Sequence, residues 1–194
     1  MATPLKRSDL MSLEQYSQQR GEFRSRVIAH KKHRRVGIGP HLFLYFEDRL
    51  TIQYQVQEML RIEKIFETGG IEEELDAYNP LIPDGQNLKA TAMLEYQDVG
   101  ERKRQLALLK GIEDMVWIQV DGFDPVYAIS NEDLERSNAE KTSAVHFMRF
   151  ELEPDMITAL RDGAALKMGS SHESYLHSTD VAHPIHEALL ADLD

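Results

Sequence analysis

Apolar residues recur at helical spacing most clearly in residues 51–70, TIQYQVQEMLRIEKIFETGG. The apolar positions of this segment are Ile52, Val56, Met59, Leu60 and Phe66. This spacing places their side chains on one face of a helix. Thr51 is suited to be the N-cap residue, and Gly69-Gly70 to end the helix. The first half of the segment also alternates in polarity, so a short strand before the helix stays open as an alternative.

Two shorter helical patterns precede this segment. Residues 8–20 carry apolar side chains at helical spacing, with Ser8 in the position of an N-cap. Gly21 follows and predicts a break, because glycine weakens a helix interior. Residues 22–34 predict a second helix that ends in the basic run HKKHRR.

The rest of the chain mixes strand-like and helix-like patterns. Strands are predicted at 36–39, 42–46, 88–96, 115–122, 125–130, 142–152 and 164–169, and helices at 71–80, 101–114 and 153–163. Residues 182–194 form a weakly helical tail that we expect to fray. No linker or internal repeat divides residues 1–194, and regular strand–helix–strand alternation is absent. The pattern therefore predicts one α+β domain, with N-terminal helices followed by a mixed or antiparallel sheet packed with helices.

The charge is unevenly distributed along the chain. The net formal charge is −11, but residues 1–35 hold nine Lys or Arg against three acidic residues, a local net charge of +6. Cations at a helix C-terminus interact favourably with the helix dipole. We therefore interpret residues 30–35 as a helix terminus that docks on the acidic body of the protein itself, or on an acidic partner. Nucleic acid is a disfavoured partner, because phosphate binding relies on extended positive potential.

The composition narrows the class of protein. The chain is 42% hydrophobic and 28% charged, as in soluble globular proteins. It has no cysteine, which excludes disulfides, thiolate metal sites and cysteine nucleophiles. No secretory signal or membrane-spanning run is evident, so we expect a cytoplasmic protein without a membrane partner. Neither a GxGxxG, a GxxxxGK[ST] nor a GxSxG motif occurs, so these routes to nucleotide binding or serine catalysis have no support.

Three residues of the 51–70 helix are candidates for ligand binding. Glu58 and Arg61 are three positions apart, so their side chains meet on one helical face, and Gln57 adds an amide beside them. A Glu–Arg pair that opens into a cleft orients a carboxylate or phosphate, or holds a general base. The alternative is an ion pair that only stabilises the helix.

His146 is the candidate in the 142–152 strand. Strand alternation puts His146, Met148 and Phe150 on one face and places Phe147 and Arg149 on the other. His146 is then either a hydrogen-bonded, half-buried histidine or an acid–base group that reaches a cleft.

Histidines also gather near the C-terminus. His183 and His186 are three positions apart and share a helical face, where imidazole nitrogens bind transition metals such as iron or zinc. His172, in HESYLH, is the better candidate ligand. The spacing matches no established metal motif, and histidines near a terminus are often only solvated.

Five separated blocks of the chain resemble a bacterial family known as domain of unknown function 3501. The blocks are RVIAHKKHRRVGIGP, VQEMLRIEKIF, EELDAYNPLIP, KTSAVHFMRFEL and HESYLH, and the resemblance covers residues 4–177. Genes of similar proteins tend to lie beside those of rubrerythrin-like and iron–sulfur oxidoreductase-like proteins. The resemblance therefore implies a role near redox or iron chemistry, with a redox or iron–sulfur protein as partner.

Three functions remain, in this order. The first is a non-enzymatic accessory or binding module that works with redox or iron proteins. The second is an enzyme that binds a metal or a small anion, with Glu58, Arg61, His146 and His172 in its site; for this function we expect Glu58, Arg61 and His146 to approach one cavity. The third is a nucleic-acid-associated protein that uses the basic N-terminal run. A homo-oligomer is compatible with all three.

Overall fold

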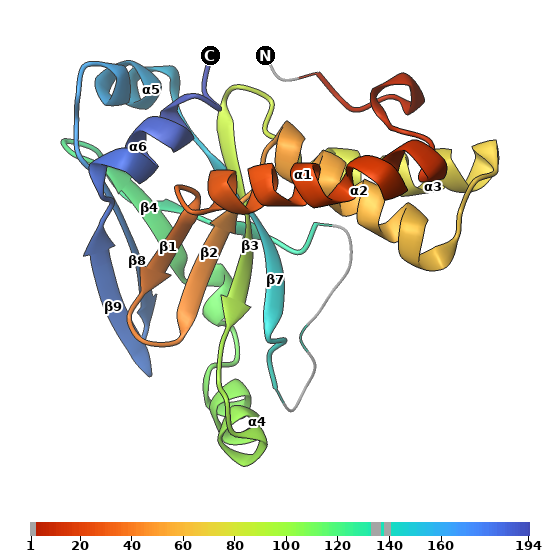
Figure 1. The fold of residues 1–194 in the computed structure, drawn as a ribbon. Helices are drawn as coiled ribbons and strands as arrows, with labels where there is room; N and C mark the ends of the chain where they lie inside the picture. The colour runs from red at the N-terminus through yellow and green to blue at the C-terminus, as the bar shows by residue number, and fades with distance from the viewer. Residues whose placement is uncertain (1–2, 133–136, 138–140) are drawn as a thin grey trace.

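The fold contains two antiparallel sheets with helices at their ends (Figure 1). The computed structural model describes residues 3–132, 137 and 141–194. The helices of this part are α1 (Leu13–Lys31), α2 (Arg49–Glu63), α3 (Thr68–Tyr78), α4 (Val99–Leu108), α5 (Pro154–Arg161) and α6 (His183–Leu190). Short 3-10 turns lie at Arg7–Asp9, Asn79–Leu81 and Ile112–Asp114. The predicted α+β class is confirmed.

The first sheet has five strands in the order β1-β2-β3-β7-β6, and the second has four in the order β5-β4-β8-β9. The strands of the first sheet are β1 (Arg35–Ile38), β2 (Leu42–Phe46), β3 (Asn87–Leu94), β7 (Val145–Glu151) and β6 (Ile129–Ser130). Those of the second are β5 (Val126–Tyr127), β4 (Val116–Val120), β8 (Leu166–His172) and β9 (Tyr175–Asp180). The segment predicted as one strand at 125–130 therefore divides, since β5 pairs with β4 and β6 pairs with β7.

The main hydrophobic core lies between the two sheets. Strand alternation turns Leu42, Leu44 and Phe46 of β2 inward, where they meet residues such as Met168 of β8. Each of these side chains is at most 2% exposed. Full burial of such a side chain contributes about 1.5–3 kcal/mol. The first sheet thus turns one face to the core and leaves the other face towards the helices.

A single long helix replaces the two that were predicted before residue 35. Ser12 caps α1 in place of Ser8, since its hydroxyl accepts a hydrogen bond from the backbone N–H of Gln15, and the Gln15 Oε1 accepts one from the backbone N–H of Ser12. Gly21 does not break α1. An interior glycine costs only about 0.5–1 kcal/mol, which the packing of the buried residue Phe23 outweighs.

The boundaries of the next helix also differ from the prediction. Asp48, not Thr51, caps α2, and the Thr51 hydroxyl accepts a hydrogen bond from the Asp48 backbone N–H. The helix ends at Lys64, which adopts a left-handed conformation with φ 57°. Gly69 and Gly70 lie inside α3 rather than at the end of α2. Helices α1, α2 and α3 pack together as a helical arm beside the first sheet (Figure 1).

The C-terminal residues dock rather than fray. Residues 183–190 form α6, Leu189 is 1% exposed and Leu193 is 5% exposed. Arg34, the fifth residue of the basic run, is 2% exposed and donates hydrogen bonds to both carboxylate oxygens of Asp192. The tail is therefore helical and carries buried leucines, and Arg34 of the basic run docks on an acidic residue of this protein.

Candidate functional site

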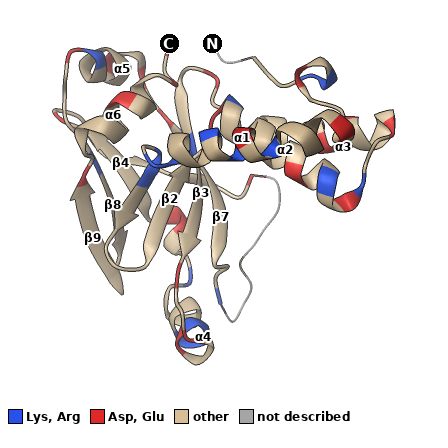
Figure 2. Ribbon diagram, in the orientation of Figure 1, with Lys and Arg blue, Asp and Glu red and all other residues tan. Residues whose placement is uncertain are grey.

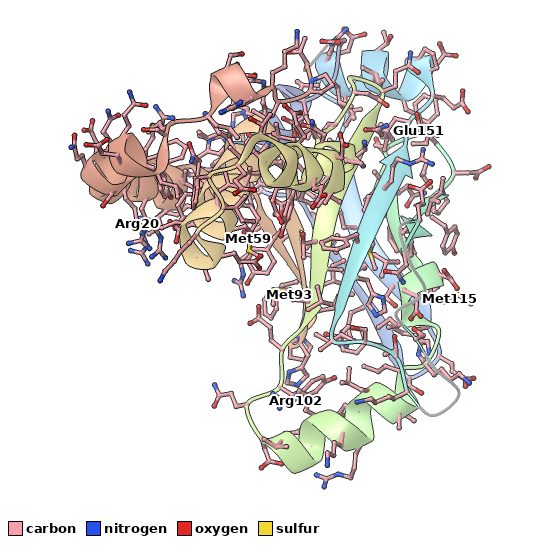
Figure 3. All side chains as sticks on the ribbon, turned by 90° about the vertical axis from the view of Figure 1, so that its right-hand side faces the viewer. Arg20, Met59, Met93, Arg102, Met115 and Glu151 are labelled. Atoms are coloured by element: carbon pink, nitrogen blue, oxygen red, sulfur yellow. The ribbon has the colours of Figure 1, made fainter. Side chains whose placement is uncertain are left out.

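The outer face of the five-stranded sheet carries a row of apolar side chains. Its half-buried side chains come from neighbouring strands: Phe43, Tyr45, Met93, Val145 and Phe147. The helical arm lies over one end of this face, and α4 lies at the other end (Figure 1). In Figure 3, Met59 of the arm, Met93 of the sheet and Arg102 of α4 lie along the same side of the molecule.

Three cavities follow one another along this face. The first, about 500 Å³, lies between α3 and the strands β3, β7 and β6. The second, about 480 Å³, shares Tyr78, Leu81 and Phe147 with the first and lies beneath α2. The third, about 700 Å³, shares Met93 with the second and reaches Arg102 of α4. Cavities of this size and apolar character commonly hold ligands or partner side chains.

We call the first of these the α3 cavity. Its apolar wall contains Met59 of α2, Tyr78 of α3, Leu81, Ile129 and Phe147. Ile129 is 42% exposed although it belongs to a strand, so part of this wall faces solvent.

Hydrogen bonds hold the wall of the α3 cavity in place. The Lys89 ammonium on β3 donates hydrogen bonds to the backbone carbonyls of Pro80, at 2.8 Å, and Ile82, at 2.9 Å. Burial lowers the pKa of Lys89 from its ordinary value. These bonds fix the segment that follows α3 against the sheet, so the cavity is formed before any ligand arrives.

The basic and the acidic side chains around the α3 cavity differ in whether they have ion-pair partners. Arg149 donates hydrogen bonds to Glu132, at 2.8 and 2.9 Å, and forms an ion pair with Glu151, and its pKa is raised by these contacts. The α3 side carries Glu74 and Asp76, for which no salt bridge is found within the described part of the chain. Burial, followed by the nearby carboxylates of Glu63 and Glu73, raises the pKa of Glu74. Arg149 is therefore paired with carboxylates and Lys89 is held by two carbonyls, whereas Glu74 and Asp76 have no cationic partner within the described residues.

The predicted Glu58–Arg61 pair is present, but it belongs to a larger cluster in the arm. The Arg61 guanidinium donates to Glu58 at 3.2 Å, while Arg20 of α1 donates two hydrogen bonds, at 2.7 and 2.9 Å, and the Tyr16 hydroxyl a third. Arg20 above all lowers the pKa of Glu58, to about 2. Gln57 is fully buried and exchanges hydrogen bonds with the backbone of Met11. These contacts join α1 to α2.

His146 lies apart from Glu58 and Arg61, on the buried face of β7. Its Nε2 is 2.9 Å from the Thr142 hydroxyl, and its Nδ1 is 3.0 Å from the Asn131 amide nitrogen. Thr142 in turn donates to Glu113 at 2.8 Å, and Ser137 also donates to this carboxylate. Because the neighbouring Phe147 points to the arm and His146 points inward, the structure does not bring the predicted residues into one cavity. The expectation of a shared site was wrong.

The three predicted metal ligands are also separated. His172 is 9% exposed on β8, where Nε2 contacts the carbonyl of Lys110 and Nδ1 accepts from the Ser174 backbone N–H. His183 and His186 lie on α6, and His186 contacts the carbonyl of Ala164. In residues 3–132, 137 and 141–194, no three His, Asp or Glu side chains gather as a metal site.

The sequence analysis did not find the α3 cavity, although one signal for its wall was present. Alternation in 142–152 already placed Phe147 and Arg149 on the face opposite His146. The other walls come from α2, α3, β3 and β6, which only the tertiary structure brings together. No helix of the described residues has the length and apolar character needed to cross a membrane.

Comparisons with known proteins give a family but no activity. A family model described as "Protein of unknown function (DUF3501)" matches residues 4–193. A crystal structure titled as a novel protein of unknown function from Burkholderia pseudomallei K96243 is 52% identical in sequence. It superposes with a TM-score of 0.94 and covers 99% of this chain and 100% of its own. No curated protein matches the sequence.

Proposed function

This chain belongs to the DUF3501 family of proteins of unknown function, and from that premise we propose that it is a non-enzymatic binding module. Its ligand would lie on the outer face of the five-stranded sheet, with an apolar group in the α3 cavity. The observation that carries the proposal is the row of three cavities on a sheet face that the helices cover only at its ends.

The preformed cavity and the positions of the acid–base groups favour a binding role over a catalytic one. An apolar cavity of about 500 Å³ that is held open by hydrogen bonds binds a ligand with little loss of free energy for reorganisation of the protein. The acid–base groups that the sequence offered lie elsewhere, because Glu58 joins two helices and His146 is 1% exposed beneath the sheet. Neither group lines the α3 cavity.

The proposal also keeps the prediction of a redox or iron–sulfur protein as partner. That prediction rests on the family resemblance alone. A binding module without catalytic groups of its own is compatible with such an accessory role.

The experiment uses an uncharged apolar dye, Nile red, whose fluorescence rises when it leaves water. Dye titration of the wild-type protein should give saturable binding. Ala77 lies on the exposed side of α3 and lines the cavity, so the Ala77→Trp substitution fills the space without disturbing a buried contact. We expect dye affinity to fall by at least about tenfold, since the indole occupies the volume that the dye needs.

Ala107→Trp is the matched control. Ala107 is exposed on α4 and lines none of the three cavities on the sheet face. This variant should bind the dye as the wild type does. Absence of saturable binding, or equal binding by Ala77→Trp and the wild type, would overturn the proposed site.

A further inference from the structure

The α3 cavity has a charge pattern that selects its occupant. Residues 65–88 contain six acidic residues and no lysine or arginine, and four of the six, Glu72, Glu73, Glu74 and Asp76, lie on α3. Figure 2 shows these acidic positions along the α3 ribbon. A ligand that reaches the cavity therefore passes a negatively charged wall.

The negative charge of this wall is not balanced internally. No Lys, Arg or His within the described residues lies at salt-bridge distance from the four carboxylates of α3. The nearest cations of the cavity already have partners, since Arg149 binds Glu132 and Glu151, and Lys89 donates to two carbonyls. An anionic ligand would thus meet repulsion, and a cationic one would meet free carboxylates.

The size and lining of the cavity favour large apolar groups. The α3 cavity and the adjoining cavity beneath α2 share three wall residues, Tyr78, Leu81 and Phe147, so two apolar side chains from one ligand can occupy them together. Tyr78 and Phe147 also place aromatic rings in this wall, and the face of an aromatic ring attracts positive charge. An amphipathic helix with two apolar anchors and basic flanks has this combination of groups.

We propose that the outer face of the five-stranded sheet binds a basic amphipathic segment of a partner protein, with apolar side chains in the α3 cavity and its neighbour, and lysines or arginines against α3. This inference rests on the proposed function, because it names the occupant of the same site. The net charge of −11 would also speed the approach of a basic partner.

The test compares two synthetic peptides of about four helical turns. One peptide has leucines at helical spacing and lysines at the remaining positions, and the other has glutamate in place of each lysine. Binding is measured by calorimetry at about 0.1 M and about 1 M salt, where the Debye length is roughly 10 Å and 3 Å. We expect the lysine peptide to bind at least about tenfold more tightly than the glutamate peptide at low salt, and to displace Nile red.

Two triple variants separate local recognition from overall charge. Glu73→Gln/Glu74→Gln/Asp76→Asn removes the two carboxylates that line the cavity, Glu74 and Asp76, and a third on the same helix, and should weaken the lysine peptide by about tenfold at low salt and little at high salt. Asp121→Asn/Asp124→Asn/Asp162→Asn removes three exposed carboxylates that line none of the three cavities, and should leave the affinity unchanged. Ala77→Trp keeps the α3 carboxylates but fills the cavity, and should also weaken the peptide.

The outcomes distinguish the two proposals. Equal weakening by both triple variants would mean attraction to net charge alone and would overturn the inference. If Nile red binds and Ala77→Trp blocks it, but the lysine peptide does not displace the dye, the binding site stands and the basic partner is wrong. If the dye does not bind, the proposed function itself fails.

Discussion

Arg34 joins three distant parts of the chain, and its removal is the most informative test of the fold. Its guanidinium donates to Asp192 Oδ1 and Oδ2 at 2.5 and 2.6 Å and to the Ala188 carbonyl at 3.2 Å. It also lies 3.1 Å from Asp48 Oδ2, which His30 approaches to 2.5 Å. The contacts tie the end of α1 to the N-cap of α2 and to the residues after α6.

Burial decides how much these contacts matter. The side chain of Arg34 is 2% exposed, that of Asp192 10% and that of Asp48 16%. Arg34→Met would leave the two carboxylates in a largely buried site without their shared cation. Loss of one partner from a buried ion pair typically costs about 3–5 kcal/mol, so we expect a loss of this size in the free energy of unfolding at pH 7.

Urea denaturation followed by circular dichroism measures this loss. With a urea dependence of about 2 kcal/mol per molar, a loss of about 4 kcal/mol lowers the midpoint by about 2 M. Arg34→Lys should lose less, about 1.5–3 kcal/mol, since an ammonium cannot make the bidentate contact with Asp192. Arg34→Met/Asp192→Leu should recover much of the stability, because it removes the more buried of the two carboxylates together with their shared cation.

The loss should depend on pH in a defined direction. Loss of the Arg34 cation raises the pKa of each carboxyl group relative to the wild type, so the native variant takes up more protons than the native wild-type protein as pH falls. The destabilisation by Arg34→Met is therefore greatest near pH 7 and shrinks at pH 5. A loss below about 1 kcal/mol at pH 7 would refute the role of Arg34, as would an equal loss at the two pH values.

Four further outcomes follow from individual sites. In the wild type, burial raises the pKa of Asp192 to about 6 from an ordinary 3.8, so its contribution to stability is complete below about pH 3.8 and is lost as pH rises through 6; Asp192→Asn should flatten this part of the profile measured by urea denaturation. The contribution of Glu58 to wild-type stability should have the opposite pH dependence. The pKa of Glu58 is lowered to about 2, so its contribution is present above pH 4.5 and is lost as pH falls towards 2. Glu58→Gln removes this contribution, and a wild-type stability that does not approach that of the variant at pH 3 would contradict the role of Glu58. Gly21→Ala should stabilise the protein by about 0.5–1 kcal/mol in thermal unfolding, since an added Cβ meets nothing within 4 Å, and a decrease would count against an unstrained helix at this position. Gly169→Ala should destabilise it by about 1–3 kcal/mol, because the added Cβ would lie 2.3 Å from the Trp117 ring, and unchanged stability would show that the ring moves freely.

The sequence predicted the types of most elements but often not their ends. Periodicity identified α2, and alternation in β7 separated the face of His146 from that of Phe147 without showing which of the two is buried. The ends depend on single capping contacts. Ser12 rather than Ser8 caps α1, because Ser12 has Gln15 three positions later and forms a capping box with it. Such a signal is readable in the sequence, but several serines, threonines and aspartates compete for each helix start.

Strand β9 was not predicted, because its pattern carries little information. Of its six residues only Tyr175 is buried, so polar and apolar residues do not alternate along Tyr175–Asp180. The strand is fixed instead by its ladder with β8 and by the Tyr175 hydroxyl, which donates to the Ile38 carbonyl and accepts from the backbone N–H groups of His41 and Leu42. Long-range contacts of this kind leave no periodic trace in the sequence.

The candidate site also depends on long-range contacts, although the sequence did show which side chains of β7 share a face. Alternation in β7 requires His146 and Phe147 to point to opposite faces of the sheet. Because the arm that carries Glu58 packs over the face of Phe147, His146 could reach Glu58 only by crossing the sheet. Whether His146 and Glu58 can share a site therefore depends on which face of the sheet the helical arm covers, and the sequence does not show this. The sequence contains the acidic run of α3 and the apolar residues Met59 and Phe147 as unrelated features, and only the tertiary structure makes them the walls of one cavity.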